Sequence, residues 1–353
     1  MAQFVPTRSF VLNLLSAKSI LVLACIVALA IPSMGARRDN PNVYVGNVNG
    51  NTISVIDSRN NRVVATIHNI FFPFCAAISP DGERLYIGQG ASGVTVIDAD
   101  TKRVIATITT PGEATALAVA PNGKHAYVTN GGANSVSVIN TRTNTLEATI
   151  PGFGDPNAIA VTPDSLHVYV SDPFANAVGV LDARTNTITD SIPVDTHPTS
   201  IVFAPDGKRA YVSNSGTDTI SVISTASKTV IDTIRVQFPA NMAITPDGRR
   251  LFAIKAAGAN TVVVVQIPED IVKTEIHVQQ DPASLAVQAN GRHLYVTNQS
   301  SSTVSIISVA NDKVEDTVRV GQAPGPIVTQ PAHHERAKRH DHDRDRRDDD
   351  DDD

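Results

Sequence analysis

Titratable and aromatic side chains occupy one position in a series of similar loops, just before the residue that starts an expected inner strand. Along the chain this position holds Phe72, Glu113, Asp155, His197, Phe238, Asp281 and Ala323. A proline follows each of them except Glu113, which is placed by spacing alone. A carboxylate beside an imidazole can act as a general base or as half of a metal site. Asp155 and His197 are therefore candidate catalytic residues together with Glu113 and Asp281, whereas Phe72 and Phe238 are candidates for ligand contact.

The same residues also have a purely structural interpretation. A residue before proline is driven towards extended geometry, and aspartate side chains bond to nearby amides in turns. We favour this role for Asp155 and His197, because no Ser-His-Asp order, HExxH, CxxC or phosphate-binding glycine loop accompanies them. Lys255 stands where other loops have asparagine and could contact an anionic ligand. A solvated lysine is the simpler expectation for it.

The elements that must position these loops recur along the whole chain. An aromatic residue opens each copy, and successive copies are 41 to 43 residues apart: Tyr44, Tyr86, Tyr127, Tyr169, Tyr211, Phe252 and Tyr295. Within each copy, short apolar runs alternate with turns rich in glycine, proline, asparagine and aspartate, which is typical of strands in hairpins. In the fourth copy we expect strands over 158–162, 167–171, 177–181 and 187–192. The pattern predicts an all-β fold, a seven-bladed β-propeller with four antiparallel strands per blade.

The two ends of the repeat region complement each other. The first copy begins at 43–46 with what is the second strand elsewhere, and the last copy carries an additional apolar segment, 325–329. We expect this C-terminal segment to pair beside 43–46 and complete the first blade. Such closure removes open sheet edges.

The motifs of the repeat resemble the YVTN-type β-propeller repeat of bacterial and archaeal envelope proteins. The resemblance depends on Tyr-Val-Thr-Asn at 127–130 and 295–298, on Pro-Asp-Gly turns such as 80–82, and on Val-Ile-Asp at 55–57 and 96–98. It covers roughly 43 to 330 and departs most in the sixth copy, where 252–255 reads Phe-Ala-Ile-Lys. It implies the fold strongly but the function weakly, because similar propellers include surface proteins, lactonase-like enzymes and cofactor-handling periplasmic proteins.

The ends of the chain differ in composition from the repeats. Residues 1–36 have Arg8 and Lys18 before an apolar run at 20–31 and then small residues, which predicts a signal peptide cleaved near Ala36. An uncleaved anchor is the alternative. We expect 37–42 to be a short linker, 43–331 the propeller, and 332–353 a disordered tail rich in His, Arg and Asp. The tail histidines are weak candidates for a divalent metal, although a solubilising tail is favoured: His333, His334, His340 and His342.

Composition limits the partners that we expect. The chain has 353 residues and a formal net charge of −6, and its repeats contain no basic patch, so we expect no nucleic acid partner. After signal cleavage Cys75 is the single remaining thiol, which excludes an internal disulfide, and we expect it to be a small core residue. No membrane span is expected in the mature chain, and we expect a monomer.

The sequence is compatible with three functions. The first is a non-catalytic scaffold, exported to the periplasm, the cell surface or beyond, that binds a protein or envelope polymer without a cofactor. The second is a lactonase-like or lyase-like enzyme with its site at the channel mouth. The third is a periplasmic cofactor or metal handling protein, which the absence of a CxxCH motif disfavours. The short, repetitive loops favour the scaffold.

Overall fold

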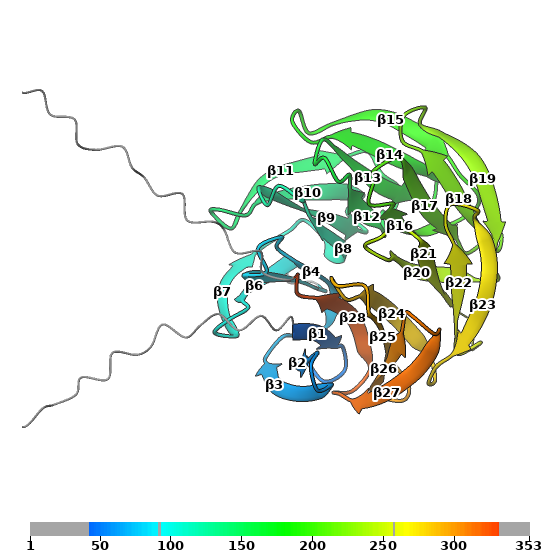
Figure 1. The fold of residues 1–353 in the computed structure, drawn as a ribbon. Coiled ribbons are helices and arrows are strands. Elements are labelled where there is room, and N and C mark those ends of the chain that lie inside the picture. Colours follow the sequence, from blue (N-terminus) through cyan, green and yellow to red (C-terminus); the bar gives the residue numbers. More distant parts are fainter. Residues whose placement is uncertain (1–41, 91–92, 257, 332–353) are drawn as a thin grey trace, which may run out of the picture. The chain divides into compact units, whose positions relative to one another are not determined.

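The computed structural model describes residues 42–90, 93–256 and 258–331. These residues form seven four-stranded antiparallel sheets, which confirms the predicted number of blades. The first strands of neighbouring sheets contact one another around a common centre, so each sheet is one blade of a propeller (Figure 1). The predicted signal peptide at 1–36 and the tail at 332–353 lie outside the described residues.

The strands follow the chain from blade to blade. Blade 1 contains β1 (Asn42–Asn47), β2 (Thr52–Asp57), β3 (Arg62–His68) and, from the end of the chain, β28 (Pro324–Thr329). Blade 2 contains β4 (Pro73–Ile78), β5 (Arg84–Gln89), β6 (Gly93–Asp98) and β7 (Arg103–Ile108). Blade 3 contains β8 (Glu113–Val119), β9 (His125–Gly131), β10 (Ser135–Asn140) and β11 (Thr145–Pro151). Blade 4 contains β12 (Ile159–Val161), β13 (His167–Asp172), β14 (Ala177–Asp182) and β15 (Thr187–Pro193).

The remaining blades repeat this order. Blade 5 contains β16 (Pro198–Phe203), β17 (Arg209–Asn214), β18 (Thr219–Ser224) and β19 (Thr229–Arg235). Blade 6 contains β20 (Pro239–Ile244), β21 (Arg250–Lys255), β22 (Thr261–Gln266) and β23 (Ile271–His277). Blade 7 contains β24 (Pro282–Val287), β25 (His293–Asn298), β26 (Thr303–Ser308) and β27 (Lys313–Arg319). Within the described ranges no helix has the length and hydropathy to cross a bilayer.

The ring closes as the sequence predicts. β28 pairs antiparallel with β1, with Ile327 opposite Val45 and Val328 opposite Tyr44. The C-terminal strand thereby becomes the inner strand of blade 1, in the order β28-β1-β2-β3. Gln330 extends the join, because its side-chain amide donates to the Gly82 carbonyl of blade 2 at 2.7 Å. Closure therefore links the chain's end both to its beginning and to the next blade.

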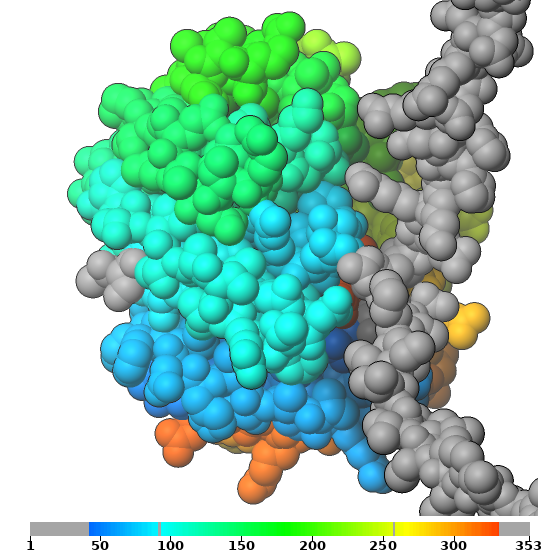
Figure 2. Space-filling view, turned by 90° about the vertical axis from the view of Figure 1, so that its left-hand side faces the viewer, coloured from blue at the N-terminus to red at the C-terminus, as the bar shows by residue number. Residues whose placement is uncertain are grey.

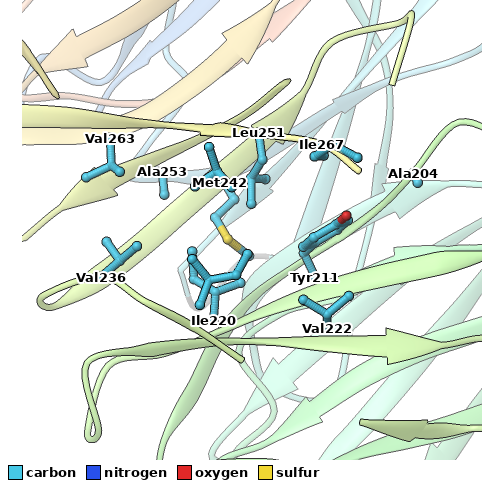
Figure 3. Packing of buried hydrophobic residues seen from close by; sticks show 12 residues of the cluster. Ala204, Tyr211, Ile220, Val222, Val236, Met242, Leu251, Ala253, Val263 and Ile267 are labelled. Atoms are coloured by element: carbon cyan, nitrogen blue, oxygen red, sulfur yellow. The ribbon is translucent and has the colours of Figure 1, made fainter. Parts of the chain in front are cut away.

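The core lies between the blades. The second and third strands are buried along nearly their whole length, because each face of a blade packs against a neighbour. Between blades 5 and 6, Tyr211 and Ile220 share one cluster with Leu251 and Val263 (Figure 3). From the side, blades coloured blue, cyan and green lie directly against one another (Figure 2). Burial on both faces explains why these strands do not alternate cleanly between apolar and polar residues.

The asparagine that ends the second strand is a structural part of the repeat. The Asn130 side-chain amide is fully buried and donates to the hydroxyls of Ser135 at 3.1 Å and Ser137 at 2.9 Å. Equivalent bonds tie Asn214 and Asn298 to hydroxyls on the following strand. The asparagine therefore holds the second strand to the third. It also explains why the third strands β10, β18 and β26 each start with a hydroxyl residue.

Several strand boundaries differ from the prediction by a single residue, including those of β12 and β1. β12 spans only Ile159–Val161, whereas a strand was expected from 158 to 162. Ala158 nevertheless bonds to the neighbouring strand, because the Ser171 N–H donates to the Ala158 carbonyl at 3.0 Å. Asn42, assigned to the linker, is the first residue of β1.

Candidate ligand-binding face at the channel mouth

The propeller has two faces with different loops. We call the side formed by the connections between blades and by the loops between second and third strands the mouth face. The opposite side, formed by the turns between first and second and between third and fourth strands, is the turn face. The register shows that six of the seven candidate positions are equivalent, because Ala114 pairs with Asn130 as Pro198 pairs with Asn214. The Asp155 N–H bonds to the preceding loop as the His197 N–H does, which places Asp155 in the same series. Glu113 therefore occupies the same place on the mouth face as its counterparts.

The backbone at these positions is not extended, contrary to the prediction from the following proline. Six of the seven residues have positive φ: Phe72, Asp155, His197, Phe238, Asp281 and Ala323, at 43° to 61°. Side-chain oxygens from the preceding loop stabilise this left-handed geometry. The N–H groups of Asp155 and His197, for example, donate to the side-chain oxygens of Asn134 and Asn176 at 2.9 and 3.0 Å. A fixed hydrogen bond outweighs the intrinsic preference of the pre-proline residue.

The structure does not bring Asp155 and His197 together. The Asp155 carboxylate accepts the Gly132 N–H at 3.2 Å, and His197 Nδ1 lies 3.0 Å from the Ser215 hydroxyl. Each side chain thus bonds to a neighbouring loop, and both are exposed. Among the described residues, no three His, Cys, Asp or Glu side chains are grouped so that they could hold a metal ion. A catalytic role of these residues stays a prediction.

The other polar candidates have different surroundings. Asp281 is exposed and accepts the Ser300 hydroxyl at 3.2 Å. Glu113 is exposed and begins β8. Lys255 is committed to an ion pair, because its ammonium group lies 3.1 Å from the Glu275 carboxylate. Lys255 is therefore neither solvated alone nor the open cation that an anionic ligand would need.

A central cavity of about 460 Å³ opens among the inner strands. Its polar lining consists of neutral side chains, including Thr115, Asn157, Asn241 and Gln299. Phe74 and Cys75 contribute to its wall on the side of blade 2. The sequence did not predict these polar residues as candidates. The signal that could have identified them is that Thr115, Asn157 and Thr199 share one position of the inner strand. The cavity suits an uncharged group better than an ion.

Cys75 is inert in this setting. Its side chain is buried, and its sulfur donates weakly to the Ala114 carbonyl at 3.5 Å. Burial raises the pKa of the thiol to about 12, so the thiolate is not formed near neutrality. The thiol therefore packs as a small apolar group, as the sequence predicts.

Exposed aromatic rings distinguish the mouth face. Five phenylalanines have 49% to 79% of their surface exposed: Phe71, Phe72, Phe74, Phe174 and Phe238. All five lie on connections between blades, at the mouth end of β4, or in the loop between β13 and β14. Phe72 and Phe74 stack with ring centroids 6.4 Å apart and planes inclined by 15°. Exposed apolar side chains that lie together indicate an interaction surface, and the stacked rings of Phe72 and Phe74 form such a pair.

Comparison with known families agrees with the observed fold. The model of the choice-of-anchor I domain matches residues 115–326. The chain belongs to the choice-of-anchor I domain family. The match supports a propeller family but is not specific for YVTN repeats, so that finer resemblance remains one of sequence motifs. No curated protein matches this choice-of-anchor I chain.

Solved structures share the fold of this choice-of-anchor I protein. Hydrazine synthase from Kuenenia stuttgartiensis is 23% identical with a TM-score of 0.67, over 74% of this chain and 90% of that one. A functionally unknown protein from Desulfotomaculum acetoxidans is 17% identical with a TM-score of 0.74, over 82% and 99%. A putative 6-phosphogluconolactonase from Bacteroides uniformis is 17% identical with a TM-score of 0.71, over 83% and 100%. At these identities the likeness concerns the fold alone.

Proposed function

We propose that this choice-of-anchor I protein is an exported, non-catalytic scaffold that binds a protein or polymer of the cell envelope through its mouth face. The observation that carries the proposal is the exposure of five phenylalanines on that face. Exposed aromatic rings supply large contact areas at interfaces. The predicted signal peptide supports export, and the family's name fits a surface role.

The position of the chain ends is consistent with display of this face. Val43 pairs with Thr329 at the turn-face end of β1 and β28. The described chain therefore starts and finishes on the turn face. Attachment through either end would leave the mouth face open to a ligand.

Retention of envelope material tests the proposal. Purified full chain is immobilised and incubated with isolated cell envelopes, and bound protein and polysaccharide are quantified. We expect the triple variant Phe72→Ser, Phe74→Ser and Phe238→Ser to lose most retention without a fall in melting temperature, because the three rings are about half exposed. Leu166→Ser is the matched control, since Leu166 is 45% exposed in a turn-face loop. Equal retention by the triple variant and the control would contradict the proposal.

The lactonase-like alternative remains a prediction about Glu113, Asp155, His197 and Asp281. The shared fold is compatible with this alternative, but no contact that the structure describes for these four side chains favours it.

A further inference from the structure

The mouth face combines its aromatic rings with carboxylates near the channel. In order around the ring, the seven equivalent positions hold Phe72, Glu113, Asp155, His197, Phe238, Asp281 and Ala323, and the two phenylalanines and three carboxylates are all exposed. Six of the seven residues have a left-handed backbone, and Glu113 is the first residue of β8. All seven therefore lie at the mouth-face end of the inner strand of a blade. Phe72 and Phe238 therefore each have a carboxylate at the equivalent position of the next blade, Glu113 and Asp281.

These carboxylates keep oxygen atoms available. One oxygen of Asp155 accepts the Gly132 N–H, and one oxygen of Asp281 accepts the Ser300 hydroxyl. A carboxylate has two oxygens and about four acceptor positions, so each can accept further bonds from a ligand. None of the seven ring positions holds a lysine or arginine, and the nearby Lys255 is paired with Glu275. The ring's charge is thus uncompensated from within.

Basic residues on this face stand further from the channel. Arg235 and Arg319 are the last residues of β19 and β27, which are the outermost strands of their blades. Apart from His197 and the Lys255–Glu275 ion pair, the inner part of the face consequently carries carboxylates and aromatic rings, and these two arginines lie at its periphery. A ligand that follows the centre of the face meets carboxylates and rings.

Carboxylates beside phenylalanine rings favour a positively charged ligand. Carboxylates form charge-assisted hydrogen bonds with ammonium and guanidinium groups, and phenylalanine faces attract the same cations. The long alkyl stems of lysine and arginine also cover apolar surface. A neutral polysaccharide would use the rings but would leave the carboxylates unpaired.

We propose that the mouth face binds an extended, lysine- and arginine-rich peptide segment of a partner protein. This inference rests on the proposed function and names the partner class of the same surface. The cationic side chains pair with Glu113, Asp155 and Asp281, and their stems lie against Phe72 and Phe238. Because several carboxylates act together, binding weakens as salt rises.

Fluorescence anisotropy with the full chain tests the inference. The probes are a labelled peptide of alternating lysine and alanine, a matched peptide of glutamate and alanine, and a labelled neutral glucan. The test variant carries Glu113→Gln, Asp155→Asn and Asp281→Asn, which keep an oxygen acceptor at each site. The control variant carries Asp100→Asn, Asp206→Asn and Glu269→Gln, which make the same change of charge at exposed positions on the turn face.

We expect the lysine peptide to bind, the glutamate peptide not to bind, and the test variant to weaken binding by about tenfold while the control variant has little effect. Equal weakening by both variants would overturn the inference, because attraction would then come from net charge alone. If the glucan binds instead of the lysine peptide, and the phenylalanine variant no longer binds the glucan, the proposal of a basic peptide partner is overturned. The scaffold proposal then remains intact. If neither probe binds and envelope retention does not depend on the phenylalanines, both proposals fail.

Discussion

The tyrosine that opens each blade allows one structural position to be tested with built-in controls. The rings of Tyr44, Tyr86, Tyr211 and Tyr295 are all at most 1% exposed, and Phe252 shows that the position accepts a ring without a hydroxyl. Their hydroxyls differ in partner. Removal of the hydroxyl therefore separates the hydrogen bond from the packing of the ring.

The expected loss of stability follows from each partner. The Tyr211 hydroxyl donates to the Asp270 carboxylate of the next blade at 2.9 Å, and a bond to a charged group contributes about 1.5–3 kcal/mol. The Tyr44 hydroxyl donates to the Ala99 carbonyl at 3.1 Å, a neutral bond that contributes about 0.5–1.5 kcal/mol. Within the part of the chain that the structure describes, the hydroxyl of Tyr295 is buried and has no hydrogen-bond partner. Its removal should be neutral or stabilising, because an unpaired polar group leaves the interior.

Urea unfolding of the single variants Tyr44→Phe, Tyr211→Phe and Tyr295→Phe at neutral pH measures these differences. We expect the free energy of unfolding to fall most for Tyr211→Phe, less for Tyr44→Phe, and not at all for Tyr295→Phe. The dependence of this free energy on urea should stay constant, since no variant changes the area buried on folding. A loss at Tyr295 as large as that at Tyr211 would refute the reasoning, because ring packing rather than the hydroxyl bond would then dominate.

Two further perturbations test the turns and the closure of the ring. The Thr245 hydroxyl donates to the Asp247 carboxylate and holds the pKa of Asp247 below its usual range. The stability that the ionised Asp247 contributes is therefore present above about pH 3.9, the usual pKa of aspartate. It is lost as the pH falls through the lower pKa of the folded state. Asp247→Asn should flatten the fall of melting temperature in that acidic window, and an unchanged acid profile would contradict the assignment. A chain that stops after Gly321 lacks β28 and should melt at much lower temperature or aggregate, since β1 loses its partner. A chain that stops after Pro331 keeps every described strand and is the control; equal melting of the two chains would show that closure does not depend on β28.

Local patterns in the sequence were sufficient to predict the number of blades and the closing strand. Apolar runs bounded by turn residues recur at the period of one blade, so the number of blades follows from the number of repeats. The first repeat lacks a strand before Tyr44, and the last repeat has an additional segment around Ile327. The sequence therefore predicted that this segment supplies the missing strand. The buried role of Cys75 followed from the same pattern.

The tertiary structure decided the geometry and partners of the candidate site. Asp155 and His197 share a loop position in sequence, but hydrogen bonds from neighbouring loops hold each in left-handed geometry and aim them at different partners. Lys255 appeared as an isolated cation until the sheet placed Glu275 beside it. Such contacts join residues from different strands and blades, and no local propensity encodes them. Repeat spacing determines which residues reach the mouth face, whereas packing between strands determines which of their charges and rings remain available to a ligand.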